Sequence, residues 1–259
     1  MSLQDIVDND FQSNATLHWE HARTIKPKVR HIRQRKAWDC GLACVQMIIR
    51  LHSDNSTWQE IYLTCRTSSI WTIHLSSALL QRGVPHVITT TCAGVNQDLE
   101  SLSFYRDHIQ KEEKDVMLLF ENSLSSGVSI IERGFSSAEF QQLLQTRCVV
   151  LILLVDNRKL RCIECGCLKR NWFSCSFTGH YVVVSSYDDE RNAFVYHDPA
   201  SGTKTCWMSN DDFDRCRLVK GTDEDVVIVP YQGAAAVTEG GGGGGGGGTG
   251  GKSDEKMNP

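Results

Sequence analysis

An uninterrupted apolar run from Cys148 to Val155 limits most strongly how this chain can fold. A strand whose residues are apolar at every position, rather than at alternate positions, is buried on both faces. The run is the longest of its kind in the sequence, yet it is far shorter than the roughly 20 residues that span a bilayer as a helix. We therefore expect a strand in the centre of a packed core, and no membrane span.

Strands are predicted mainly in the second half of the chain. A β-rich run from Tyr181 to Tyr187 and a second from Ala193 to Asp198 flank the polar stretch 188–192, which predicts a hairpin. Val226 to Pro230 forms a last strand. Because helical patterns fill most of the first half, the chain belongs to the α+β class.

Helices are predicted from two features: residues that favour a helix N-terminus, and apolar residues repeated at helical spacing. Residues 41–51 carry apolar side chains at the spacing of a helix that packs one broad face on a core. Thr57–Glu60 and Ser136–Glu139 have the form of capping boxes. Two more helices are predicted at Trp71–Arg82 and Asn210–Arg217, and a strand is predicted at Val84–Thr91.

Length and composition fit one domain with two tails. The 259 residues are 41% apolar, which is enough for one core over 26–232, with a flexible segment at 1–25 and a disordered glycine-rich tail at 233–259. A net charge of −4 gives no reason to expect nucleic-acid binding. The N-terminus does not resemble a secretory signal, so the eleven cysteines are expected to be reduced thiols of a cytoplasmic protein, with the nucleus as an alternative. The oligomeric state stays open.

Cys40 is the candidate nucleophile. Asp39 is a good N-cap residue, which would place Cys40 in the first turn of the helix, where backbone N–H groups and the helix dipole favour a thiolate. We therefore expect a lowered pKa for Cys40. Cys44, one turn deeper, is expected to be a buried structural thiol.

His180 and Asp198 are the candidate base and orienting group. If the two strands pair around 188–192, Asp198 lies near the end of one strand beside His180 on the other, within carboxylate–imidazole reach. His197 should point to the opposite face of the sheet. Gln34, six residues before Cys40, could donate an amide hydrogen to a developing oxyanion.

These segments carry a family resemblance. The run Gln34 to Cys44, with Gly179-His180-Tyr181 and Asp198-Pro199-Ala200, resembles the C39-like branch of the papain-like cysteine peptidases. The resemblance implies a helix carrying Cys40 packed on a mainly antiparallel sheet carrying His180 and Asp198, with Gln34 as oxyanion donor. Over roughly residues 20–232 the chain resembles more closely the guanylyl cyclase domain-containing proteins, a family named for a reported cyclase activity.

Two enzymatic functions and one non-enzymatic function follow. The favoured one is a cysteine hydrolase or acyl transferase acting on a peptide or protein, which needs no cofactor. The alternative is conversion of GTP to cyclic GMP, which would need a divalent metal held by carboxylates. Its candidate carboxylates are Asp188, Asp189, Asp211 and Asp212, although they fit a turn and a helix start more simply. An inactive scaffold is the third possibility.

A cysteine-rich loop lies between two predicted core strands. Cys162 and Cys165 have the Cys-x-x-Cys spacing of a zinc half-site, and a zinc cluster would add Cys167 and Cys175. The spacing of the third and fourth cysteines is irregular, so the expectation is a loop that binds no metal and that the fold can do without.

Overall fold

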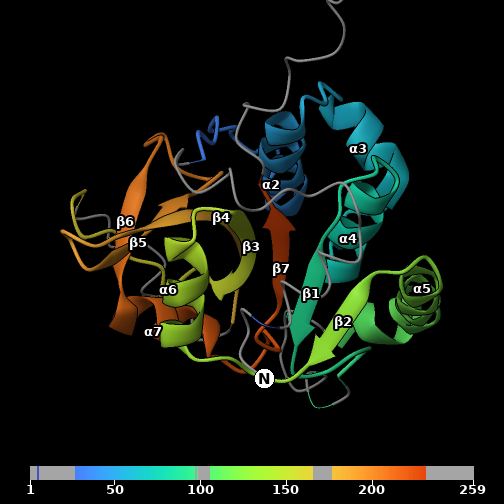
Figure 1. Ribbon diagram of the computed structural model, residues 1–259. Helices are drawn as coiled ribbons and strands as arrows, with labels where there is room; N and C mark the ends of the chain where they lie inside the picture. Colours follow the sequence, from blue (N-terminus) through green and yellow to red (C-terminus); the bar gives the residue numbers. More distant parts are fainter. Residues whose placement is uncertain (1–4, 6–26, 97, 99–105, 166–176, 232–259) are drawn as a thin grey trace, which may run out of the picture.

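A computed structural model describes residues 5, 27–96, 98, 106–165 and 177–231. The tails expected at 1–25 and 233–259 therefore lie outside the described residues, apart from Asp5. A seven-stranded sheet in the order β2-β1-β7-β3-β4-β5-β6 forms the centre of the described structure, with helices on both sides (Figure 1). The fold is α+β, as the sequence predicts.

The sheet is mainly antiparallel. All neighbouring strands run antiparallel except the pair β1–β2 at one edge. The strands are β1 (Val87–Thr90), β2 (Ser129–Glu132), β3 (Val149–Asp156), β4 (Gly179–Asp188), β5 (Ala193–His197), β6 (Cys206–Ser209) and β7 (Val226–Pro230).

The central strand β3 is buried on both faces, which confirms the prediction from its apolar run. Leu151, Leu153 and Val155 point into the cluster that includes residues of helices α6 (Ser137–Gln145) and α7 (Asn210–Arg217). The alternate residues Ile152 and Leu154 point into a second cluster under helix α2 (Cys40–Ile49). The sheet is therefore the middle of three layers, with α2 on one side and α6 and α7 on the other.

Local signals locate most helix boundaries. Both capping boxes form: Thr57 opens α3 (Trp58–Cys65) and Ser136 opens α6. Helix α4 is shorter than predicted, at Thr72–Leu80, and α2 continues into a short 3₁₀ turn, η2 (Arg50–His52). That turn ends at Ser53, whose φ of 61° lies in the left-handed region.

Helix α5 (Arg106–Ser125) and the edge strands β2 and β6 were not predicted from the sequence. Helix α5 spans twenty residues of mostly polar sequence, and β2 follows it as a short parallel edge strand. Val116 of α5 packs with Ile73 and Ile88 in a small separate cluster. Their formation thus depends on packing at the sheet edge rather than on a strong local pattern.

Candidate functional site

Cys40 is the first residue of α2 and is buried. The backbone N–H of Tyr181 donates a hydrogen bond to its sulfur, as does that of Gly41. Tyr181 directly follows His180 in β4, so the thiol lies beside the first residues of that strand. The prediction that α2 begins at the cysteine is confirmed.

Asp39 does not cap α2 through its side chain, although it occupies the N-cap position. Its buried carboxylate accepts the backbone N–H groups of Arg35 (3.1 Å) and Lys36 (2.9 Å), and Nε1 of Trp58 (2.8 Å). The capping role predicted for Asp39 is therefore wrong. The carboxylate instead fixes the loop before the helix against α3, and that loop carries Gln34.

His180 and Asp198 form the predicted pair. Nε2 of His180 lies 2.7 Å from Oδ1 of Asp198, and both side chains are almost completely buried. The backbone N–H of Ala200 donates to the same carboxylate oxygen (2.9 Å). His197 points elsewhere, with its ring nitrogens at Lys204 O and Ser185 Oγ, as strand alternation predicts.

The Gln34 loop packs against the Asp198 end of the site. The backbone N–H of Gln34 donates to the carbonyl of Pro199 (3.0 Å), and Nε2 of His31 lies 2.9 Å from the carbonyl oxygen of Asp198. Nε2 of Gln34 donates to the carbonyl of Lys36 (2.7 Å). Its Oε1 is buried and has no hydrogen-bond partner in the described part of the chain. The structure thus brings the Gln34 loop to Asp198 through the backbone.

Cys40 opens onto a cavity of about 310 Å³. Its lining includes the apolar side chains of Trp38, Ile73 and Leu154, called the apolar wall below, and the carboxylates of Asp223 and Asp225, called the acidic end. A volume near 300 Å³ is at the small end of ligand-binding cavities. The cavity can therefore hold one side chain or a small group beside the thiol.

The acidic end of the cavity was missed in the sequence. Oγ1 of Thr72 donates to Asp225 (2.5 Å) and also lies 3.0 Å from the hydroxyl of Tyr181. Loss of solvent around the carboxylate raises the pKa of Asp225 to about 7, while Thr72 and Thr90 oppose the shift. In the sequence, Asp223-Glu224-Asp225 looks like a solvated turn before a strand, and no local signal distinguishes it.

The expected low pKa of Cys40 is wrong. Loss of solvent around the buried thiol raises the pKa of Cys40 to about 11, and the carboxylate of Asp39 adds to the increase. The N–H groups of Tyr181 and Gly41 lower the pKa, but they are outweighed. The Cys40 thiol is therefore protonated at neutral pH. The pKa of Cys44 is also raised by burial, and Cys44 is a core residue as predicted.

This protonation state gives a testable pH dependence. Below a pKa of about 11 the thiolate fraction of Cys40 rises about tenfold per pH unit, so its alkylation by iodoacetamide should rise as steeply between pH 7.5 and 9.5. Site-resolved mass spectrometry of the folded protein measures the rate, and the denatured chain is the control. An alkylation rate that is already constant above pH 7.5 would mean that the thiolate forms at much lower pH.

Gly41 allows α2 to lie close to β4 and α4. A Cβ atom at position 41 would come within 2.8 Å of a Leu75 methyl carbon, 3.0 Å of Ile70 and 3.1 Å of the Tyr181 ring. A larger residue would push apart the helix that carries Cys40 and the strand that carries His180. The glycine in the Asp-Cys-Gly string is therefore required by packing.

We expect Gly41→Ala to lower the free energy of unfolding by about 2 kcal/mol, because overpacking a close contact typically costs 1–3 kcal/mol. Urea denaturation followed by circular dichroism measures the loss. Gly202→Ala is the matched control, since a Cβ there meets nothing within 4 Å. Equal midpoints for the two variants would show that α2 can move away at no cost.

The carboxylates considered for a cyclase metal site serve structural roles. Asp188 accepts from Arg191 and Trp207, and Asp189 accepts from Gln145. Asp212 accepts from Arg215 at the start of α7. Across the described ranges, these acids do not join any group of three or more side chains whose potential metal-ligating atoms lie within 4.8 Å of one another. The turn interpretation is confirmed for Asp189 and the helix-start interpretation for Asp211 and Asp212, whereas Asp188 is the last residue of β4.

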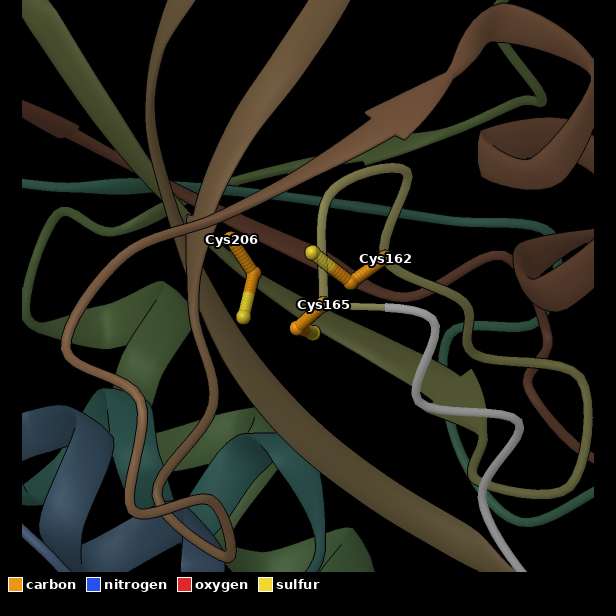
Figure 2. A group of neighbouring side chains, drawn as sticks. All are labelled: Cys162, Cys165 and Cys206. Carbon is orange, nitrogen blue, oxygen red and sulfur yellow. The ribbon is translucent and has the colours of Figure 1, made fainter.

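The cysteine-rich loop brings together two thiols of the set considered from the sequence and one outside it. Cys162 and Cys165 meet Cys206 of β6, with the three sulfur atoms within 4.8 Å of one another (Figure 2). Cys167 and Cys175 lie outside the described residues. The sequence could not select Cys206, because it is distant in the chain and becomes a neighbour only through the strand order.

The described residues form an α+β domain in which a helix-borne cysteine lies beside the sheet and a buried His180–Asp198 pair occupies the ends of two strands. Sequence comparison identifies the family: the model described as guanylylate cyclase matches residues 29–229. A curated relative, Guanylyl cyclase 1 of Arabidopsis thaliana, is 35% identical over 208 residues, covering 78% of this chain and 75% of the relative. The chain belongs to the guanylylate cyclase family.

One solved structure is a distant match. It is a double glycine motif protease from an AMS/PCAT transporter in complex with the leader peptide, with 13% identity and a TM-score of 0.42. The match covers 80% of this chain and 95% of that one. Within the described part of the chain, none of the helices combines the length and the apolar character needed to cross a bilayer.

Proposed function

We propose that the protein is a cysteine hydrolase or acyl transferase that acts on an acyl group of a peptide or protein. Cys40 is the nucleophile, His180 the base, Asp198 the orienting group and Gln34 the oxyanion donor. The observation that carries the proposal is the buried 2.7 Å contact between His180 Nε2 and Asp198. His180 directly precedes Tyr181, whose backbone N–H donates to the Cys40 sulfur. A base oriented by a third group beside a helix-borne thiol is the arrangement that nucleophilic catalysis requires.

The first step transfers a proton as the sulfur attacks. Because Nε2 of His180 faces Asp198, Nδ1 is the nitrogen that takes the thiol proton. Since the pKa of Cys40 is about 11, proton transfer accompanies the attack on the acyl carbonyl carbon rather than preceding it. His180 then gives the proton to the departing group, which leaves a thioester on Cys40.

The second step returns the free enzyme. Water, or an acceptor amine in a transferase, gives a proton to His180 and attacks the thioester carbonyl, and the thiol leaves with that proton. In both steps, the second amide hydrogen of Gln34 stabilises the developing oxyanion, since the first hydrogen is donated to Lys36. The Asp39 carboxylate fixes the loop that carries Gln34.

The cavity limits the substrate class. Its apolar wall suits an aliphatic or aromatic side chain next to the attacked carbonyl, because apolar contact there removes surface from water. Its acidic end favours a neutral or positively charged group over an anionic one. A peptide with such a side chain fits better than a free acid.

A guanylyl cyclase is the second candidate. The family and the curated relative carry that name, and Asp223 and Asp225 both line the cavity. Two carboxylates could hold the divalent metal that phosphoryl transfer needs. If this candidate is correct, the metal would lie at Asp223 and Asp225, and Cys40 would have no role in the chemistry.

The two candidates predict different products and different essential residues. The protein is incubated with p-nitrophenyl acetate and analysed for acetylated Cys40 by mass spectrometry; in parallel it is given GTP and Mn²⁺ and assayed for cyclic GMP. The proposal predicts acetyl-Cys40 in the wild type and in Cys44→Ala, and none at this position in Cys40→Ala. Cyclic GMP formation that survives Cys40→Ala and is lost in Asp225→Asn would replace the hydrolase with the cyclase.

A further inference from the structure

We propose that Cys162, Cys165 and Cys206 bind a zinc ion that joins the loop after β3 to strand β6. This site lies apart from the Cys40 cavity, whose lining includes none of the three residues. It replaces the expectation, made from the sequence, of a cysteine-rich loop without metal.

The geometry of the three thiols suits a tetrahedral metal. Their sulfur atoms all lie within 4.8 Å of one another, and the three side chains converge from two separate segments (Figure 2). Zn–S bonds of about 2.3 Å in a tetrahedral site set the sulfur atoms about 3.8 Å apart. A contraction of about 1 Å or less therefore brings them into position.

The backbone around the site is already fixed, so the thiols do not meet by the chance position of a loose loop. The N–H of Ile163 donates to the carbonyl of Trp207 (2.8 Å), and the hydroxyl of Tyr196 donates to the carbonyl of Arg161 (2.8 Å). On the outer side, Arg191 donates to Glu164 (3.0 Å). The loop is thus bonded to β5, to β6 and to the turn between β4 and β5.

The ligand chemistry favours zinc over harder cations. Three thiolates are soft donors that bind Zn²⁺ well and Mg²⁺ or Ca²⁺ poorly. Cys162 and Cys206 are buried, while Cys165 is exposed. Because one side of the site faces solvent, a water molecule can complete the tetrahedron at the fourth position. Binding releases the thiol protons, so affinity should fall as the pH falls.

The position of the site indicates what the ion does. Strand β6 pairs with β5, and Asp198 follows directly after β5. Zinc bound between the loop and β6 would hold this edge of the sheet in place and thereby support the strand end that carries Asp198. The role is structural, and the ion does not contact the Cys40 site.

The experiment measures metal content and stability on the full chain, expressed with added zinc and purified in reductant without chelator. We expect about one zinc per chain by plasma mass spectrometry. Cys165→Ser and Cys206→Ser should each weaken zinc affinity at least about a hundredfold, because even partners outside the ligand set cost 10–100-fold. Co²⁺ in place of zinc should give a thiolate-to-metal charge-transfer absorption that both variants lose.

The controls separate metal binding from misfolding. Cys165→Ser changes an exposed side chain and should leave the circular dichroism spectrum intact. Cys216→Ser is the matched buried control: its sulfur donates to Phe213 O and lies outside the site, so zinc content should be unchanged. A strong zinc chelator should lower the melting temperature of the wild type and not that of Cys165→Ser. Zinc-free wild-type protein, or equal zinc in wild type and Cys165→Ser, would overturn the proposal.

Discussion

Replacing His180 with Ala should slow acylation of Cys40 by p-nitrophenyl acetate about 10³-fold, the middle of the range for general-base catalysis. The effect is large because burial holds the pKa of the thiol at about 11, so attack at neutral pH depends on a base that removes the proton. Asp198→Asn should slow the reaction less than His180→Ala does, since it misorients the imidazole without deleting it. Site-resolved mass spectrometry of acetyl-Cys40 over time gives both rates.

His86→Ala is the matched control for this experiment. His86 is buried and bonded to Ser76, away from the cavity that Cys40 lines, so its removal tests the general cost of deleting a buried imidazole. The rate of Cys40 acylation in His86→Ala should stay within about twofold of the wild-type rate. If His86→Ala and His180→Ala slowed acylation equally, the loss would reflect stability and not catalysis.

Replacing Arg217 with Met should lower the free energy of unfolding by about 3 kcal/mol, near the lower end of the cost of removing one partner of a buried ion pair, because the two acids that remain are partly exposed. Arg217 is 1% exposed, and its guanidinium bonds to Asp214 (2.7 Å), Glu224 (3.1 Å) and the carbonyl of Phe135 (2.7 Å). Met keeps much of the volume against the Phe213 ring but leaves the two acids without their cation. The melting temperature should fall by roughly 6–12 °C.

Arg215→Met controls for the loss of one positive charge from α7. Arg215 pairs with Asp212 three residues earlier, as Arg217 pairs with Asp214, but its side chain is 44% exposed. Exposed pairs contribute about 0.2–1 kcal/mol, so this variant should shift the melting temperature by no more than about 4 °C. Equal shifts in the two variants would show that burial of Arg217 adds nothing.

Local patterns were sufficient for most of the helices and central strands and for the His180–Asp198 pair, but not for α5, β2 or β6. The capping boxes at Thr57 and Ser136 are contained within four residues each, and the hairpin at 188–192 fixes which residues of β4 and β5 can meet. Its register has an irregularity between Val184 and Ser186, but Asp198 still reaches His180. A pairing set by one turn can be inferred from the sequence that forms it.

Properties of a residue that depend on neighbours distant in the chain could not be inferred from the sequence. The helix start alone predicts a low pKa for Cys40, whereas the sheet and the helices packed around it remove solvent and raise it. Asp39 looks like a cap until Trp58 and the backbone of the preceding loop are placed around it. Cys206 joins Cys162 only because β6 pairs with β5 and the loop folds back onto it.

The distance between the Cys40 sulfur and Nδ1 of His180 tests the central claim most directly. It can be measured in a crystal structure of the protein with an acyl group trapped on Cys40. A nucleophile and its base must lie within hydrogen-bond reach, so we expect a separation of about 4 Å or less, with Nε2 of His180 still bonded to Asp198. A separation above about 8 Å, or an acyl group found on another cysteine, would contradict the assignment of Cys40 as the nucleophile.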